Sequence, residues 1–283
     1  FKYPARTEEI LTFVSTRLSE HELNEVLEDL IALQLIFSRD GFYFPEKNMD
    51  AAILKRKNSE KRLKEKMKTI RRYARLISAF PYVKSVSISG SCSKGLLDVE
   101  GDVDYFIIAA PGRLWLCRTL LIAFKKIFLL NSKKYFCVNY FVDADNLLIP
   151  DKNLFVAYEI KTLAPVNNFR LFSEFVAANG WTDSFFPNKQ QHNGTFLRKE
   201  DGQKFFARVI EFVFNTRLGS VAERFCFDLT LSTWKKRYPG FNKEEFELNF
   251  RSRKNVSKHH PRGFQLKVLE EFTKKLGNVK VSS

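Results

Sequence analysis

Residues 86–108 read VSISGSCSKGLLDVEGDVDYFII. An apolar strand runs into Gly90-Ser91, ten residues intervene, and Asp102-Val103-Asp104 opens a second apolar strand. Glycine lets a backbone approach a phosphate closely, and the serine hydroxyl with neighbouring amides can hold the phosphate oxygens. Because side chains two apart on a strand share a face, we expect Asp102 and Asp104 to point the same way.

Two carboxylates at close range repel one another unless a hard cation lies between them. The pair therefore predicts a divalent-metal site with Asp102 and Asp104 as ligands and Mg2+ or Mn2+ as the metal. With Gly90 and Ser91 at the phosphate turn, Ser93 and Lys94 are further candidates for nucleotide contacts.

The flanking sequence predicts a small mixed α/β sheet around this stretch. Strands are expected at 83–89, 103–109 and 135–142, with an apolar helix over 113–130 between the second and the third. Arg118, Lys125 and Lys126 interrupt the apolar helix on one face, which favours a mostly buried helix over a membrane span.

The combination of hydrophobic-Gly90-Ser91, a spacer of this length and Asp102-hydrophobic-Asp104-hydrophobic resembles the signature of the nucleotidyltransferase superfamily related to DNA polymerase beta. The resemblance covers roughly residues 83–142. It implies phosphate contacts at the turn, metal ligation by the two aspartates, and a third carboxylate from a later strand. At the position that would align with that carboxylate the chain has Asn139, and the acids nearby are Asp143 and Asp145.

This resemblance implies an enzyme that transfers a nucleoside monophosphate from an NTP to a hydroxyl-type acceptor. The acceptor could be RNA, a nucleotide or an anionic lipid headgroup. Because an amide cannot take up a proton as a carboxylate can, Asn139 also allows a catalytically reduced, nucleotide-binding regulator. A third class, a nucleic-acid-binding protein without chemistry, rests on net charge alone.

The first 50 residues predict a winged-helix-like segment. Helices are expected from Thr7 and from Ser19 or Glu20, followed by a hairpin around the Asp40-Gly41 turn. The second helix carries acids and no Lys or Arg, so we expect it to pack on protein rather than to bind DNA. Its acids are Glu20, Glu22, Glu25, Glu28 and Asp29.

Positive charge is concentrated in the middle and at the C-terminal end of the 283-residue chain, whose formal net charge is +15. Residues 54–75 hold eleven Lys/Arg against two Asp/Glu and predict a basic connecting helix within 51–80. Residues 235–281 hold thirteen against five. Such charge favours polyanionic partners, and any membrane contact is expected to be peripheral.

After the core at 81–150, residues 151–283 predict a helical C-terminal region. Helices are expected at 153–163, 168–178, 203–217, 221–236 and 262–276. His259 and His260, in a basic loop, are expected at the surface, with a phosphate contact as the alternative. The four cysteines are widely spaced without a zinc pattern, which is typical of reduced thiols in a cytoplasmic protein.

Overall fold

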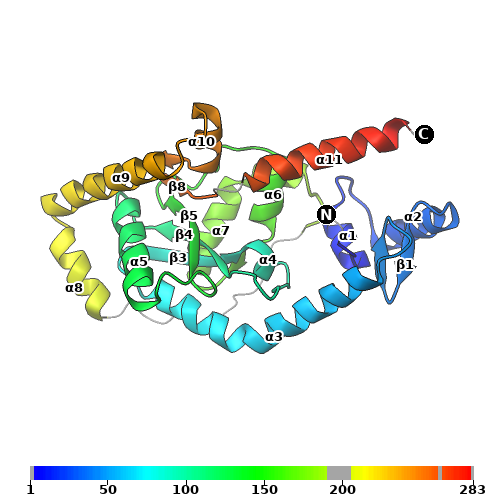
Figure 1. The fold of residues 1–283 in the computed structure, drawn as a ribbon, viewed down its shortest axis with the longest axis horizontal. Helices are drawn as coiled ribbons and strands as arrows, with labels where there is room; N and C mark the ends of the chain where they lie inside the picture. The colour runs from blue at the N-terminus through cyan, green and yellow to red at the C-terminus, as the bar shows by residue number, and fades with distance from the viewer. Residues whose placement is uncertain (1–2, 190–204, 261–262, 282–283) are drawn as a thin grey trace.

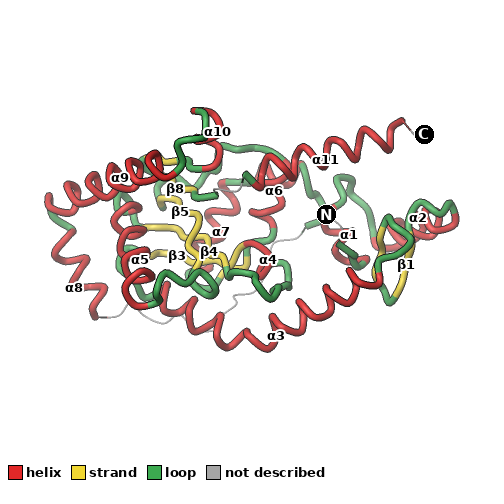
Figure 2. Tube along the Cα trace, in the orientation of Figure 1, coloured by secondary structure: helices red, strands yellow, loops and turns green. Residues whose placement is uncertain are grey.

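The computed structural model describes residues 3–189, 205–260 and 263–281 (Figure 1). Its centre is a six-stranded mixed sheet in the order β6-β3-β4-β5-β8-β7. Helices cover the sheet on both faces and also extend beyond it (Figure 2). The predicted class, a mixed α/β fold, is therefore confirmed.

The predicted core strands and helix are present. They are β3 Val83–Ser89, β4 Asp104–Ala109, α5 Leu114–Phe128 and β5 Cys137–Asp143. β3 and β4 pair antiparallel, whereas β4 and β5 run parallel. A parallel pair needs a crossover, and α5 provides it.

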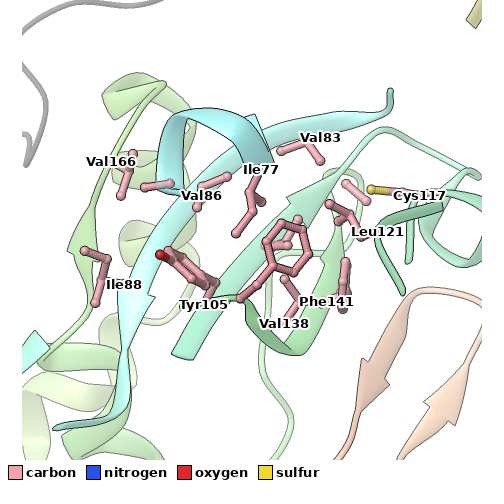
Figure 3. Packing of buried hydrophobic residues seen from close by; sticks show 14 of the residues in the cluster. Ile77, Val83, Val86, Ile88, Tyr105, Cys117, Leu121, Val138, Phe141 and Val166 are labelled. Atoms are coloured by element: carbon pink, nitrogen blue, oxygen red, sulfur yellow. The ribbon is translucent and has the colours of Figure 1, made fainter. Parts of the chain in front are cut away.

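One face of the sheet packs against three helices: α3 Asp50–Ser78, α5 and α9 Arg217–Arg237. Alternate strand residues, among them Val86, Ile88 and Tyr105, project into this core, where Ile77 of α3 and Leu121 of α5 meet them (Figure 3). All five side chains are buried. Helix α3 is thus amphipathic, with its apolar stripe on the sheet and most of its basic residues in solvent.

The other face packs against α6 Leu154–Lys161 and α7 Phe169–Ala178. Phe106 of β4 lies with its ring centroid 4.9 Å from that of Phe175 on α7. Each helix begins at an asparagine whose side chain accepts a backbone amide of the first turn: Asn153 for α6 and Asn168 for α7. Asp104 lies two residues before Phe106, so this is the sheet face nearest the candidate site.

Residues 151–283 are predicted from the sequence to be helical. They contain helices, but they also supply three short strands that complete the sheet. The short strands β6 Ala164–Pro165 and β8 Val256–Lys258 pair with β3 and β5, and β7 Ser252–Arg253 pairs with β8. The remaining elements are the 3-10 turn η1 Gly180–Ser184 and the helices α8 Phe205–Phe214, α10 Lys243–Asn249 and α11 Phe264–Val281. Residues 203 and 204 of the predicted 203–217 helix lie outside the described residues.

The N-terminal elements follow the sequence prediction closely. They are α1 Thr7–Phe13, α2 Glu20–Ala32, β1 Phe37–Arg39 and β2 Phe42–Phe44. Ser19 and Glu22 form a capping box at the start of α2, since Ser19 Oγ accepts the Glu22 amide at 3.2 Å and Glu22 accepts the Ser19 amide. The five acids of α2 are solvent-exposed.

A buried guanidinium joins the N-terminal elements to α3. Arg56 is only 3% exposed and donates to Glu9, to Glu60 and to the carbonyl of Pro4. Its guanidinium also lies over the Phe42 ring, 5.2 Å from the centroid. One arginine of the basic helix therefore has a structural role, because a buried cation is tolerated when carboxylates pair with it.

The histidine pair is half-buried and packs against aromatic rings, whereas the sequence predicts an exposed surface position. The His259 ring lies 4.9 Å from the Trp234 ring, centroid to centroid, and 5.5 Å from that of Phe250. Burial lowers the pKa of His259 to about 3 and that of His260 to about 4. Nearby cations, Arg118 for His259 and Lys258 for His260, lower these pKa values further.

We expect the folded protein to lose stability as the pH falls from about 6.5 towards 4. In that window the unfolded chain protonates both histidines and the folded chain does not, which costs about 1.4 kcal/mol per pH unit for each histidine. His259→Phe keeps an aromatic ring in the cluster. It should reduce the change in the free energy of unfolding with pH by about 1.4 kcal/mol per pH unit, the contribution of one histidine. Urea unfolding at pH 7.5, 5.5 and 4.5 measures it, and an unchanged slope would contradict the burial.

All four cysteines, Cys92, Cys117, Cys137 and Cys226, are buried free thiols. Among the described residues, none of the helices combines the length and apolar character needed to span a bilayer.

Candidate active site

The Gly90-Ser91 turn is a short helix, α4 Gly90–Ser93, that directly follows β3. Gly90 has φ +65°, in the left-handed region that favours glycine. Ser93 Oγ and Lys94 Nζ both donate to the Gly90 carbonyl, at 2.9 and 3.0 Å. Ser91 is exposed. Of the four residues predicted to contact a nucleotide, Ser93 and Lys94 therefore stabilise the turn by hydrogen bonds to Gly90, and Ser91 faces solvent.

Asp104 lies directly against this turn. A methyl group built on Gly90 would come within 2.5 Å of Asp104 Oδ2, so glycine is required for the contact. Ser89 and Asp104 are opposite one another in the β3–β4 pair, and Asp104 is opposite Cys137 in the β4–β5 pair. The first residue of β4 thus meets the end of β3 and the start of β5.

Asn139 lies in contact with Asp104, as its predicted role in the site requires. Its Nδ2 donates to Asp104 Oδ1 at 2.6 Å, and its Oδ1 accepts from Cys137 Sγ at 3.2 Å. Burial raises the pKa of Cys137 to about 12, so the thiol stays protonated and serves as a donor. The thiol therefore orients the amide with its NH2 group towards the carboxylate.

Asp102 precedes β4 in irregular chain, and the strand begins at Asp104, one residue later than the predicted 103–109. Val103 still pairs with the neighbouring segment, because its amide donates to Lys134 and its carbonyl accepts from Cys137. Burial is the main cause that raises the pKa of Asp104 to about 6, and the negative charges of Asp102 and Glu159 raise it further. The two aspartates are thus close enough to repel.

Glu159 of α6 is a member of the site that the sequence did not reveal. Its Oε1 accepts from Lys94 Nζ at 2.9 Å, and the ammonium also lies 5.0 Å from the centroid of the Tyr158 ring. A lone glutamate in an apolar helix gives no sequence signal of its distant partner. Lys94, predicted as a phosphate contact, is thus already paired with a carboxylate that a phosphate would have to replace.

Asp143 and Asp145 do not take the place of the third carboxylate. Asp143 is opposite Ala109, at the far end of the parallel pair that starts at Asp104 and Cys137. Five strand residues separate these ends by about 17 Å. Asp143 is 4% exposed, and its carboxylate accepts the amides of Gly112 and Asp145 at 2.7 and 2.9 Å. It anchors a turn.

The donor set fits a cation that arrives with a nucleotide better than one held by protein alone. Within residues 3–189, 205–260 and 263–281, no three His, Cys, Asp or Glu side chains are placed to hold a metal ion. Mg2+ commonly takes one or two protein carboxylates and completes its shell with phosphate oxygens and water. Asp102 and Asp104 provide such a pair, and the raised pKa of Asp104 is what a cation would relieve.

Comparison of the chain with models of protein families, with curated proteins and with solved structures finds no match. The fold and the site define a mixed α/β protein in which a glycine turn, two aspartates and an asparagine meet at one end of the sheet.

Proposed function

We propose that the chain is a metal-dependent nucleotidyltransferase that moves a nucleoside monophosphate from an NTP to a hydroxyl-type acceptor. The observation that carries this proposal is the contact of Asp104 with both Gly90 and Asn139. Three separate stretches of sequence thereby bring together a glycine turn, a carboxylate pair and a polar side chain, which supports a role in phosphate and metal binding. The N-terminal helix-helix-hairpin would be the accompanying winged-helix-like module.

In this function Asp102 and Asp104 would hold Mg2+ or Mn2+, which neutralises phosphate charge and makes the α-phosphorus more electrophilic. Ser91 and the turn amides would position the triphosphate, and Lys94 would exchange Glu159 for a phosphate oxygen. The acceptor oxygen would bond to the α-phosphorus while the bond to the β-phosphate oxygen breaks and pyrophosphate leaves. Asn139 holds Asp104 in place but cannot accept the acceptor's proton, which must pass to water or phosphate.

A transfer assay with α-labelled NTPs tests the proposal. The protein is incubated with Mg2+ or Mn2+, each NTP, and separate pools of tRNA, total protein, anionic phospholipid and small metabolites. We expect label on one pool, and none with the Asp102→Ala/Asp104→Ala variant. If no pool is labelled while the NTP still binds in a metal-dependent way, the transferase is excluded.

That second outcome would favour the alternative, a catalytically reduced regulator that binds a nucleotide. Asn139 in place of a carboxylate is the observation in its favour. The pair Asp102 and Asp104 argues against it, because burying a carboxylate beside another costs stability unless a cation joins them.

Asn139→Asp should turn the site into a stronger metal site. Two carboxylates would face each other across the present 2.6 Å contact, so we expect the free protein to lose about 1–3 kcal/mol at neutral pH. Mg2+ should then restore stability, with a larger rise in Tm than in the wild type. Thermal unfolding with and without Mg2+ measures this, Asn139→Ala is the control, and equal Mg2+ effects in all three proteins would contradict the proposed metal position.

A further inference from the structure

Helices α8 and α9 form one end of the molecule, opposite the end that holds α2 (Figure 1). They pack on each other, and each presents exposed apolar side chains, which we together call the α8–α9 face. Phe205 and Phe212 are each 82% exposed. The face consists of Phe205, Phe206, Val209, Phe212 and Val213 on α8 and Leu218, Val221, Phe225 and Leu229 on α9.

The opposite sides of both helices are fixed to the core, so the apolar side is turned outward by specific contacts. Glu211 of α8 accepts the Tyr82 amide at 2.7 Å. Glu223 of α9 accepts the amides of Trp115 and Leu116 at 2.7 and 2.8 Å, where α5 begins. Rotation of either helix to bury its exposed phenylalanines would break these partly buried hydrogen bonds.

The exposed charges on the same helices are almost all positive. Residues 205–237 are all described and contain six cations, all exposed: Arg208, Arg217, Arg224, Lys235, Lys236 and Arg237. Glu211 and Glu223 are partly buried and face inward through the hydrogen bonds above, which leaves Asp228 as the exposed acid of this segment. Arg217, Arg224 and Lys235 are seven and eleven residues apart and so follow one side of α9 beside its apolar stripe.

The exposed apolar side chains together with the flanking cations indicate which kind of partner binds the α8–α9 face. A second copy of the chain would bring the same cations to the same place, so like charges would oppose pairing. Large exposed apolar patches mark protein or membrane contacts. A helix that exposes phenylalanine and leucine between lysines and arginines matches a membrane interface, where apolar side chains enter the acyl boundary and cations meet anionic headgroups.

We propose that the α8–α9 face binds peripherally to the surface of an anionic lipid bilayer. Phe205, Phe206 and Phe212 would insert below the headgroups, and Arg217 and Arg224 would lie at the phosphates. The inference is independent of nucleotidyl transfer and would hold for either function proposed above.

Sedimentation of the full chain with phospholipid vesicles tests the inference. We expect binding to vesicles that contain phosphatidylglycerol, little binding to pure phosphatidylcholine vesicles, and release at roughly 0.5 M NaCl, where charges are screened within a few ångströms. Phe206→Ser/Phe212→Ser should reduce binding about tenfold or more. Arg217→Gln/Arg224→Gln should do the same through charge.

The matched control is Leu33→Ser/Leu35→Ser, which removes two leucines that are 68% and 59% exposed just after α2, at the other end of the molecule. It should bind vesicles like the wild type. Equal thermal unfolding of all variants shows that the fold is intact. The inference is overturned if the wild type fails to bind anionic vesicles, or if Phe206→Ser/Phe212→Ser binds as well as the wild type. It is also overturned if analytical ultracentrifugation finds a dimer that this variant dissociates while vesicle binding is absent.

Discussion

Asp104→Asn is expected to abolish nucleotidyl transfer, by about a thousandfold or more, while making the folded protein more stable at neutral pH. The loss follows because an amide is a poor ligand for Mg2+ compared with a carboxylate, and charge neutralisation at the phosphate contributes several kcal/mol to such a step. The gain in stability follows because the Asp104 carboxylate is buried near the negative charges of Asp102 and Glu159, and an uncharged amide avoids that unfavourable environment.

The sign of the stability change follows from the raised pKa. Asp104 titrates near 3.8 in the unfolded chain and at about 6 in the folded protein, so the folded state binds more protons between these values. Stability from this group is therefore present below about pH 4 and is lost as the pH rises through 6. Asp104→Asn removes this loss of stability, so the free energy of unfolding at pH 7.5 should rise by about 1–3 kcal/mol.

Urea unfolding of wild type and Asp104→Asn at pH 4 and pH 7.5 measures this effect. The two proteins should differ at pH 7.5 and converge at pH 4. The amide oxygen of the new asparagine can still accept from Asn139 Nδ2, so the hydrogen bond is retained. A variant that is less stable than the wild type at pH 7.5, or that still transfers nucleotide, would contradict the placement of Asp104.

Gly90→Ala is expected to damage both the fold and the site. The new methyl group would lie 2.5 Å from Asp104 Oδ2, and a residue with a side chain would have to adopt φ +65°. The left-handed conformation alone costs about 1–2 kcal/mol, and displacement of a carboxylate held by Asn139 adds to it. We expect a loss of about 3 kcal/mol or more in stability and at least a hundredfold loss of nucleotide transfer.

Gly95→Ala is the matched control, because Gly95 has φ +84° and nothing within 4 Å of a built methyl group. It should cost only the conformational penalty, about 1–2 kcal/mol, and leave transfer close to the wild-type rate. The difference between the two variants isolates the contact with Asp104. Equal losses in both would mean that Gly90 matters for its backbone conformation alone.

The sequence could predict the core of the site because its parts are close together in the chain. The ends of β3 and β4, the Gly90-Ser91 turn and the Asp102/Asp104 pair lie within 23 residues, and alternation along a strand fixes which side chains share a face. Asn139 could be placed as well, since a strand after the α5 crossover returns parallel to β4 and brings its first residues to the same end.

Contacts between distant segments could not be predicted in this way. β6, β7 and β8 are two or three residues long, and a segment that short becomes a strand only through its neighbour's hydrogen bonds. The pairing of Lys94 with Glu159 joins a turn to a helix 65 positions away. His259 and His260 follow a basic segment that is typical of a surface loop, yet β8 carries His259 into the aromatic cluster around Trp234 and places His260 beside the Tyr140 ring.

By itself, the sequence determined the mixed α/β class, the order of the core elements, the acidic second helix and the glycine turn with its carboxylate pair, because each depends on local periodicity or short spacing. Only the tertiary structure decided that Asp143 anchors a turn at the far end of the sheet and that Asp104 is buried against Gly90 and Asn139. It also decided that Phe205, Phe206 and Phe212 of α8 and Phe225 of α9 face outward. The physical reason is that burial, and with it pKa and exposure, depends on which distant segments cover a side chain.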